Sequence, residues 1–350
     1  MVKVGIAGFN ALTRTLLRVF ISKLTQTCPP QENLFHIVSI NCPKTSIECM
    51  VYMLKHDPIY GDPKVEISHN LDEISIGGIR IAVTNCEEQA APWKNTKTEY
   101  VIDVINGTND KSGMHLRDGV KKVFVAGNGT GRYPVHVFGV NHECIKDRAD
   151  LIVMGSQHIN AVACIASILH EPYILQEVVT SYLVPSGIES GVEKPCNKTF
   201  CKDLVPLENA FTPATSPGRG KFVSKIYPDL CDKIHSAAFQ TSIPMIGGVQ
   251  FLGRLCTNTT KEDIICKIKE ASEGLLKGIL STSEDIRSTD ALATEYSCIV
   301  DLKTVQYKKK GNIVHLFGIY DCGYAYATRI FDLANFVAYR EQLQNKQCHN

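Results

Sequence analysis

The stretch Leu151 to Glu171 has the residue types and spacing of a catalytic strand-to-helix junction. An apolar run, Leu151 to Met154, is followed by the small residues Gly155 and Ser156 and then by a segment with helical periodicity. A helix N-terminus lowers the pKa of a thiol and stabilises developing negative charge, so a nucleophile is expected at this point. The residue there is Gln157, whose amide has no ionisable proton and no useful nucleophilicity. The position suited to chemistry carries a group that does not perform it.

Three nearby side chains are further candidates for chemistry, and each has a simpler structural interpretation. Cys164 lies two helical turns after Gln157 and is expected to face the core. His158 begins the helix, where the dipole disfavours an imidazolium; a neutral hydrogen-bonding or metal-binding role competes with the simpler view of a partly exposed residue in a vacated pocket. His170 is expected to be a structural histidine near the helix C-terminus.

The N-terminus has the order of a dinucleotide-binding βαβ unit. Val2 to Ile6 is an apolar strand, and a glycine turn and an amphipathic helix follow it. The phosphate-binding fingerprint requires three glycines. Gly8 supplies the first, but Asn10 and Thr13 occupy the second and third positions. Because asparagine tolerates a positive φ, the turn can persist, but a phosphate would be held less closely.

The second strand, His36 to Asn41, ends without the acidic residue that would bind the adenosine ribose hydroxyls. Cys42 stands in that place. Loss of a charged acceptor costs about 1.5–3 kcal/mol for each hydrogen bond. Together with the glycine changes, this predicts that a dinucleotide binds several orders of magnitude more weakly than to an intact site.

Composition excludes several classes of protein. The chain has 350 residues, of which 44% are apolar and 21% charged, as expected for a globular protein with two domains. The 37 basic and 36 acidic residues give a net charge of +1, so nucleic acid and anionic membranes are not expected partners. No apolar run approaches the roughly 18 residues of a transmembrane helix. The N-terminus lacks a signal-peptide pattern, which predicts a cytoplasmic protein.

The 14 cysteines are scattered singly, as is typical of free thiols in a reducing compartment. Cys196 and Cys201 are the closest separated pair, but no second pair matches them. We therefore expect no metal site.

The remaining chain predicts buried strands followed by a second kind of sheet. Tyr100 to Asp103 and Lys122 to Val125 read as buried strands, with a helix from Asn109 to Asp118 between them. Beyond Val178 the strands are longer and alternate in polarity, as in an antiparallel sheet. The further expected elements are strands at Ile243 to Leu255 and Val305 to Ile319, a helix at Thr257 to Leu276 and a solvated hairpin turn at Lys308 to Lys310.

Five segments carry a resemblance to a known family. They are VKVGIAGF, MVYMLKHDPIYG, FGVNHE, ASEGLLKGIL and IYDCGYAYATRIFDL. Their order and spacing resemble glyceraldehyde-3-phosphate dehydrogenase over essentially the whole chain. The resemblance implies an α/β protein with an N-terminal Rossmann domain at residues 1–150, completed by a C-terminal helix at 328–350. It also implies a catalytic-type α+β domain with an antiparallel sheet at 151–327, NAD as cofactor and a homotetramer. The polar run Ile188 to Pro213 would be the subunit-interface loop that closes over a neighbouring cofactor.

The resemblance also indicates where the family's chemistry would lie. That reaction needs a thiolate nucleophile and an imidazole base. The cysteine position matches Gln157, while the base position falls on Leu183 if one residue is dropped after Tyr173, or on Val184 if none is. Loss of both groups typically lowers the rate about 10⁴- to 10⁶-fold. The flanking Ser156 and Asn160 match the family, and His158 replaces a threonine.

The implied anion and cofactor positions have changed as well. Gln240 takes the place of the arginine that grips the substrate phosphate, a bidentate role that glutamine does not fill. Of the two threonines after the histidine, one is Ser186 and the other Ile188, and a threonine-glycine pair is Pro217-Gly218. Cys322 replaces the asparagine that orients the nicotinamide amide, whereas Tyr326 is retained. The full set of vestigial cofactor positions is Gly8, Phe9, Asn10, Cys42, Cys322 and Tyr326.

The leading hypothesis is a pseudoenzyme of this family that acts through oligomerisation, scaffolding or partner binding and binds NAD weakly or not at all. The alternative is an NAD-dependent aldehyde or glyceraldehyde-3-phosphate oxidoreductase of glycolysis with an altered site. A third possibility is binding to RNA or the cytoskeleton, which the near-neutral charge does not favour. Assembly with an active paralogue is a further expectation, motivated by the interface-like blocks that still resemble the family beside the divergent run Ile188 to Pro213.

Overall fold

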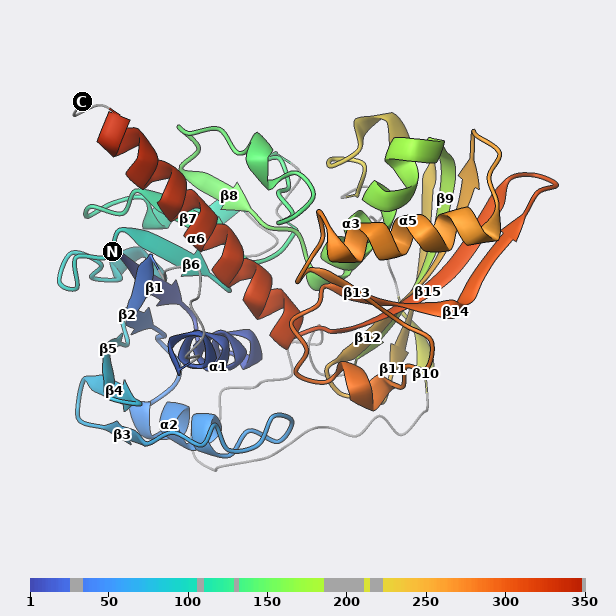
Figure 1. Ribbon diagram of the computed structural model, residues 1–350. Helices are drawn as coiled ribbons and strands as arrows, with labels where there is room; N and C mark the ends of the chain where they lie inside the picture. Colours follow the sequence, from blue (N-terminus) through green and yellow to red (C-terminus); the bar gives the residue numbers. More distant parts are fainter. Residues whose placement is uncertain (26–33, 106–109, 129–131, 186–210, 215–222, 348–350) are drawn as a thin grey trace.

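The computed structural model describes residues 1–25, 34–105, 110–128, 132–185, 211–214 and 223–347 (Figure 1). Two sheets form the two halves of the molecule, and the long helix α6 (Tyr324–Gln347) runs from the second half across the first. The two-domain α/β architecture with a Rossmann-type first half and an α+β second half is confirmed.

The first sheet has eight strands in the order β3-β4-β5-β2-β1-β6-β7-β8. Its strands are β1 (Val2–Ala7), β2 (Phe35–Asn41), β3 (Ile67–His69), β4 (Glu73–Ile76), β5 (Ile79–Thr84), β6 (Tyr100–Asp103), β7 (Lys122–Val125) and β8 (Leu151–Val153). From β5 to β8 all neighbours are parallel, and chain order reverses at β1, between β2 and β6. Ligands of such sheets bind at this reversal, beyond the carboxyl ends of the strands.

Helices α1 (Ala11–Thr25) and α6 complete the hydrophobic core of the first half. Leu16, Leu17 and Phe20 of α1 are buried, as their helical spacing predicts, and they share one core with Ile330 and Leu333 of α6. The short α2 (Ile47–Lys55) is capped by Ser46, whose side chain accepts a hydrogen bond from the Cys49 amide. The C-terminal helix therefore belongs to the core of the N-terminal half.

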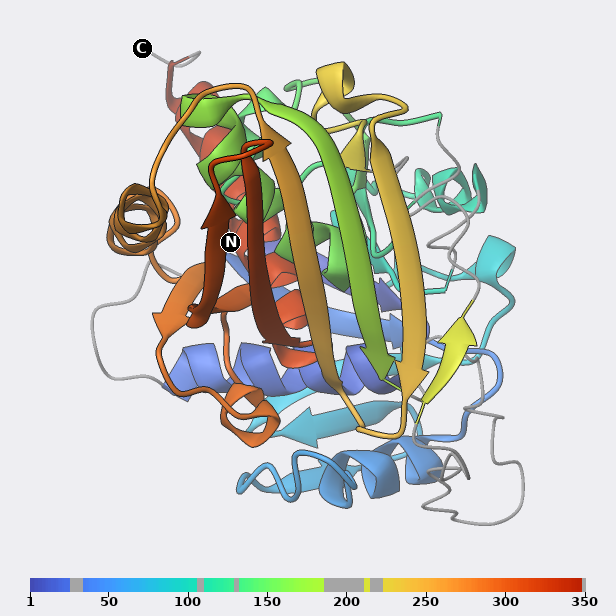
Figure 2. The same cartoon turned by 90° about the vertical axis from the view of Figure 1, so that its right-hand side faces the viewer.

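The second sheet has seven strands in the order β10-β11-β9-β12-β15-β14-β13. They are β9 (Leu175–Pro185), β10 (Phe211–Ala214), β11 (Ile234–Thr241), β12 (Ile246–Leu255), β13 (Leu280–Ser283), β14 (Cys298–Lys308) and β15 (Ile313–Asp321). Helices α3 (Gln157–Tyr173) and α5 (Lys261–Glu273) pack against one face. Figure 2 looks onto the other face, which no α-helix of the described chain covers, although the 3-10 helix Ser288–Ala291 packs on one end of it, against β12 and β15.

Several predicted boundaries differ from the structure. The predicted helix Asn109 to Asp118 is only a short 3-10 helix, Asp110–His115. The predicted strand Val305 to Ile319 is interrupted: it spans the end of β14, a turn and β15, because Gly311 and Asn312 adopt positive φ values of 96° and 51°. The predicted hairpin turn after Lys308 is thereby confirmed.

Two further boundaries reflect local chemistry. Helix α5 begins at Lys261 rather than Thr257, because the Thr260 side chain caps it by accepting from the Asp263 amide at 3.1 Å. Strand β8 pairs with β7, so Leu151–Val153 lies in the first sheet and the chain passes to the second half only at α3.

Helix α3 ends in a strained residue. Ile174 adopts φ +56°, a left-handed conformation that disfavours a β-branched side chain, and 52% of its surface is exposed. Its amide donates to the His170 carbonyl at 3.0 Å and its carbonyl accepts from the Cys256 amide at 2.8 Å, which holds it there. Such a conformation costs of the order of 1–3 kcal/mol.

We therefore expect Ile174→Gly to stabilise the fold by about 1 kcal/mol, because glycine adopts positive φ without steric cost. Urea unfolding followed by circular dichroism measures the change. Ile243→Gly is the matched control: Ile243 is 44% exposed but has no positive φ, so this change should destabilise. Equal destabilisation by both changes would show that Ile174 is not strained.

Candidate active site and dinucleotide crevice

The junction between β8 and α3 is built as the sequence predicts. Gly155 turns the chain with φ +67°, where an added Cβ would lie 3.1 Å from Val135 Cγ1. The Ser156 amide donates to the Asn128 side chain at 2.8 Å. Asn160 donates from its amide to the Ser156 carbonyl at 2.9 Å and to the Met154 carbonyl at 3.2 Å. These bonds hold the turn in place and direct Gln157 to the helix N-terminus.

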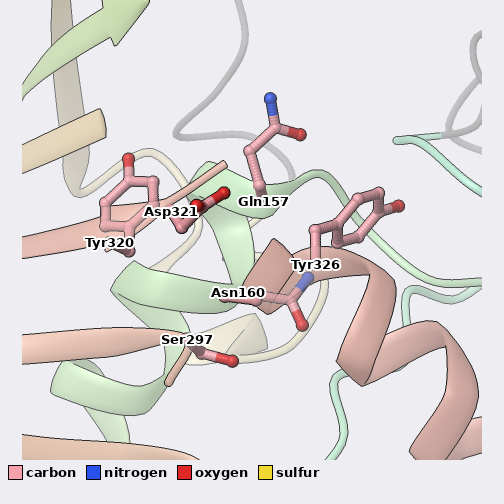
Figure 3. A pocket seen from close by; sticks show the side chains of 7 residues that line it. Gln157, Asn160, Ser297, Tyr320, Asp321 and Tyr326 are labelled. Atoms are coloured by element: carbon pink, nitrogen blue, oxygen red, sulfur yellow. The ribbon is translucent and has the colours of Figure 1, made fainter. Parts of the chain in front are cut away.

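Gln157 is half-buried and lines a shallow pocket with about 160 Å³ of free space, open solvent included (Figure 3). The other lining residues are Asn160, Ser297, Tyr320, Asp321, Ala325 and Tyr326. None of these residues is a cysteine or a histidine. The pocket therefore offers amide, hydroxyl and carboxyl groups, and no thiolate or imidazole to a reacting carbonyl.

His158 is fully buried, so the expectation of a partly exposed histidine is wrong. Its Nδ1 lies 2.7 Å from the Tyr320 hydroxyl, and its ring packs at 5.7 Å from the ring of Tyr182. The physical reason is position: the second residue of α3 faces the sheet, where two buried tyrosines from β15 and β9 enclose it. His158 therefore connects α3 with the second sheet.

The two alternatives for the base position lie on opposite faces of β9. Val184 is buried on the same face as Tyr182, toward α3, because residues two apart share a face. Leu183 lies on the other face and is 36% exposed. Gln240 of β11 is directly paired with Val184, so the structure brings these two predicted positions together on the α3 side. Neither candidate for the base offers an ionisable group.

The other two candidates near the junction have structural roles. Cys164 is fully buried in the core, as predicted, and burial raises the pKa of its thiol to about 12. His170 Nε2 lies 2.8 Å from Asp229 Oδ2, its Nδ1 accepts from the Leu175 amide at 3.2 Å, and its ring packs on Tyr227.

Tyr326 and Cys322 are both buried beside this junction. The Tyr326 hydroxyl donates to the Gly155 carbonyl at 2.5 Å, so α6 supports the turn from which α3 starts. Burial raises the pKa of this hydroxyl. Cys322 is 2% exposed, and its amide donates to the Met245 carbonyl at 2.7 Å.

Sequence reasoning missed the role of Asp321. Its carboxylate accepts from the Tyr60 hydroxyl at 2.7 Å and from the amides of Gly323, Tyr324 and Ala293 at 2.7–2.8 Å. Burial raises the pKa of Asp321. Burial, followed by the charge of Asp321, also holds the pKa of Tyr60 well above its usual range. Both residues lie in quoted segments, but no spacing shows that two residues so far apart in sequence meet.

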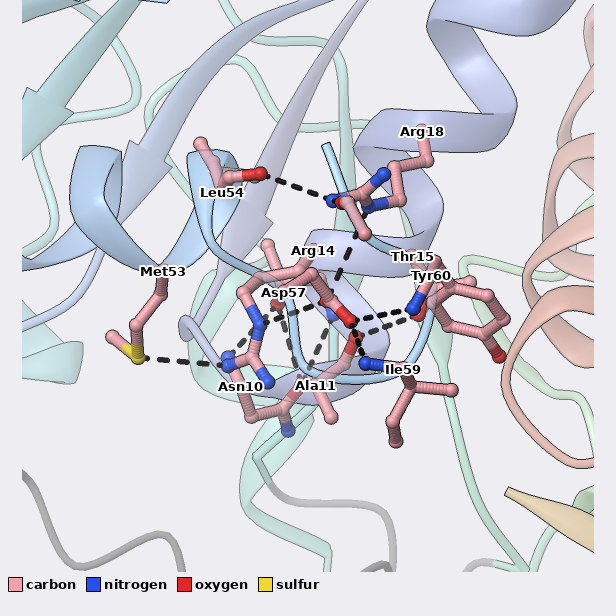
Figure 4. Close-up of polar contacts among 12 residues, drawn as sticks. Asn10, Ala11, Arg14, Thr15, Arg18, Met53, Leu54, Asp57, Ile59 and Tyr60 are labelled. Atoms are coloured by element: carbon pink, nitrogen blue, oxygen red, sulfur yellow. Dashed lines mark hydrogen bonds and ion pairs between the residues drawn. The ribbon is translucent and has the colours of Figure 1, made fainter. Parts of the chain in front are cut away.

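Tyr60 is positioned by a buried ionic network in the first half (Figure 4). Asp57 accepts from the amides of Ile59 and Tyr60 at 2.9 and 3.0 Å, and its other oxygen lies 3.7 Å from Arg14 Nε and 4.0 Å from Arg18 Nε. Burial lowers the pKa of Arg18. This network belongs to structure rather than to an open anion site.

The turn after β1 persists, although not through the residue expected to allow it. The positive φ, +106°, is at Gly8 rather than Asn10. Phe9 is buried, and the Asn10 side chain caps α1 by accepting from the Thr13 amide at 3.1 Å. Cys42 at the end of β2 is 6% exposed, and its thiol donates to Thr45 Oγ1 at 3.5 Å.

Several predicted positions lie outside the described residues. They are Ser186, Ile188, Pro217 and Gly218, with most of the run from Ile188 to Pro213. Among the residues that are described, no three histidine, cysteine or acidic side chains gather closely enough to hold a metal ion. The ten cysteines in this part of the chain are free. No helix within the described ranges is both long and apolar enough to cross a bilayer.

Comparison with known proteins agrees with this geometry. Residues 2–110 match the glyceraldehyde 3-phosphate dehydrogenase NAD binding domain, and residues 159–322 match the C-terminal domain of the same family. Glyceraldehyde-3-phosphate dehydrogenase of Claviceps purpurea (strain 20.1) is 30% identical over 342 residues, which cover 96% of this chain and 98% of the relative. The chain belongs to the glyceraldehyde-3-phosphate dehydrogenase family.

Other relatives have a similar level of identity. Glyceraldehyde-3-phosphate dehydrogenase of Omphalotus olearius is 30% identical, with 97% of this chain and 99% of the relative covered. The cytosolic enzyme of Chondrus crispus is 29% identical, with 95% and 96% covered. This member of the glyceraldehyde-3-phosphate dehydrogenase family thus retains both domains, at an identity low enough to permit wide change in the site.

The Tyr60–Asp321 bond predicts a pH-dependent effect of mutation. Because the folded-state pKa of Asp321 is raised above its unfolded value near 3.9, its contribution to stability is greatest below about pH 4 and is lost as the pH rises through the raised pKa. Tyr60→Phe removes a donor to the charged carboxylate. The substitution should lower the free energy of unfolding by about 1.5–3 kcal/mol at pH 7. The loss should be smaller at pH 4, where the carboxyl takes up its proton.

Urea unfolding of Tyr60→Phe at the two pH values measures this difference. Tyr339→Phe is the control, because Tyr339 is 53% exposed on α6 and far less depends on its hydroxyl. An equal cost of Tyr60→Phe at both pH values would contradict the assignment of the bond to the ionised carboxylate.

Proposed function

We propose that this protein is a member of the family that does not catalyse the dehydrogenase reaction and acts instead through oligomers and partner binding. The observation that carries the proposal is Gln157 at the N-terminus of α3, on an otherwise intact strand-turn-helix junction. The amide neither forms a covalent bond to a carbonyl carbon nor gives up a proton at neutral pH. Val184 on the α3 face offers no base.

The purified protein, given glyceraldehyde 3-phosphate, phosphate and NAD⁺, should turn over at less than about a thousandth of a family enzyme's rate, because nucleophile and base are lost together. Gln157→Cys alone should remain at this level, since its thiol gains no imidazole partner. NADH absorbance measures the rate. Activity above that limit in the unmodified protein would end the proposal and favour the alternative, an oxidoreductase with an altered site.

The uncovered face of the second sheet supports the oligomer. Val179 and Leu183 of β9 are 40% and 36% exposed on it. They pair with Leu252 of β12 and Phe239 of β11 on the same face. Phe317 of β15 is only half-buried there as well, whereas Ile319 packs with the cluster that includes Ala291. Polar side chains such as Gln250 and His315 lie among these apolar ones, a mixture that suits an interface with a second copy related by twofold symmetry.

Val179→Asp should therefore reduce the oligomer to a smaller species, because a buried unpaired charge at an interface is strongly unfavourable. Analytical ultracentrifugation of both proteins measures the mass. Leu275→Asp is the control: Leu275 is 88% exposed after α5, so its replacement should leave the mass unchanged. A monomeric unmodified protein would exclude this interface.

The cytoplasm as location and an assembly with an active paralogue are parts of the same proposal. The location rests on the family, one of whose relatives is named as cytosolic, and the mixed assembly rests on the exposed sheet face, which a related subunit would recognise as well as a second copy. Native mass spectrometry of a co-expressed mixture tests the mixed assembly, and homo-oligomers alone would remove it.

A further inference from the structure

We propose that the dinucleotide crevice of this protein is closed from within, by a side-chain cap at Asn10 and by the side chain of Ile105, against any nucleoside diphosphate. The inference deepens the proposed function but does not rest on Gln157. It concerns the carboxyl ends of β1 and β6, where the order of the first sheet reverses.

The first element of the closure is a reciprocal cap on α1. The Thr13 amide donates to Asn10 Oδ1 at 3.1 Å, and the Asn10 amide donates to Thr13 Oγ1 at 3.4 Å. A dinucleotide fold leaves backbone N–H groups at this helix N-terminus for the pyrophosphate. Here Asn10 and Thr13, the residues that replace two fingerprint glycines, satisfy two of those donors with each other.

The second element connects the turn to the neighbouring strand. Asn10 Nδ2 donates to the Val104 carbonyl at 3.3 Å, while the Val104 amide donates to the Ala7 carbonyl at 3.1 Å. The Asn10 side chain therefore spans the distance from the start of α1 to the end of β6. A glycine at this position would leave that space open to a ligand.

The third element is steric. A Cβ built on Gly8 would lie 2.5 Å from Ile105 Cγ1 and 2.9 Å from Val104 Cγ2, so these side chains already pack directly against the glycine backbone. The first fingerprint glycine normally serves the tight turn, and here the space beside it is filled by the side chains of Val104 and Ile105. The Ile105 amide donates to Asp103 Oδ1 at 2.9 Å, which fixes the residue in place although its side chain is 44% exposed.

The residues present therefore do not fit NAD. Steric closure and the loss of the ribose-binding acid at Cys42 are separate causes of weak dinucleotide binding. Reversing each one should restore affinity for a different set of ligands. Removing the closure should restore affinity for ligands that carry a diphosphate. Restoring the acid should improve affinity for any ligand that carries the adenosine ribose, with or without phosphate.

The test compares the unmodified protein with the double variant Asn10→Gly/Ile105→Ser by isothermal titration with NAD⁺, ADP and adenosine. We expect no binding of NAD⁺ or ADP by the unmodified protein below millimolar concentration. We expect at least a tenfold gain in affinity for both in the double variant, and no gain for adenosine. Ile243→Ser, at a side chain that is also 44% exposed, is the matched control and should gain nothing.

Two outcomes overturn the closure: micromolar binding of NAD⁺ by the unmodified protein, or a folded double variant that binds NAD⁺ and ADP no better than the unmodified protein, whether or not Cys42→Asp restores binding. If circular dichroism shows that the double variant is unfolded, the single Ile105→Ser decides by the same criteria. Tight NAD⁺ binding without turnover would overturn the closure and leave the proposed function standing. Turnover by the unmodified protein would overturn the proposed function.

Discussion

The Asp321 carboxylate is the point on which both halves of the structure depend. It accepts hydrogen bonds from Tyr60 in the first half, from Ala293 before β14, and from Gly323 and Tyr324 where α6 begins. Those four donors fix where β15 ends and α6 begins. Because α6 supplies core residues to the first half and supports the Gly155 turn through Tyr326, one buried charge determines both the domain arrangement and the geometry of the junction.

Several polar groups at the two crevices of the chain form hydrogen bonds with each other, although the buried hydroxyls of Ser156 and Ser297 do not do so within the described part of the chain. The Asn10 side chain accepts a hydrogen bond from the Thr13 amide at the start of α1. The Tyr320 hydroxyl is hydrogen-bonded to His158 Nδ1, and the Cys42 thiol donates to Thr45 Oγ1. A buried donor or acceptor left without a partner costs about 1–3 kcal/mol. These internal hydrogen bonds stabilise the fold by satisfying groups that would otherwise be buried without a partner.

Much of the fold followed from local pattern, and the failures share one cause. The strands Tyr100–Asp103 and Lys122–Val125 were predicted to the residue because continuous apolar runs mark buried parallel strands. The buried state of His158 was not predicted, because it depends on tyrosines at positions 182 and 320. The contact of Ile105 with Gly8 is likewise non-local. Periodicity reports which face of an element is buried, and it carries no information on what lies opposite.

The N-termini of helices α1 and α3 differ in how their backbone donors are satisfied. At α1 the side chain of Asn10 occupies the donors, whereas at α3 the N-cap Ser156 makes no side-chain cap hydrogen bond. Helix α3 is held instead by its Asn160 and Asn128 contacts, which stabilise the turn whatever residue stands at 157. The proposed closure at α1 depends on Asn10, Thr13 and Ile105 together, whereas the α3 junction holds its geometry through contacts that do not involve the side chain at 157.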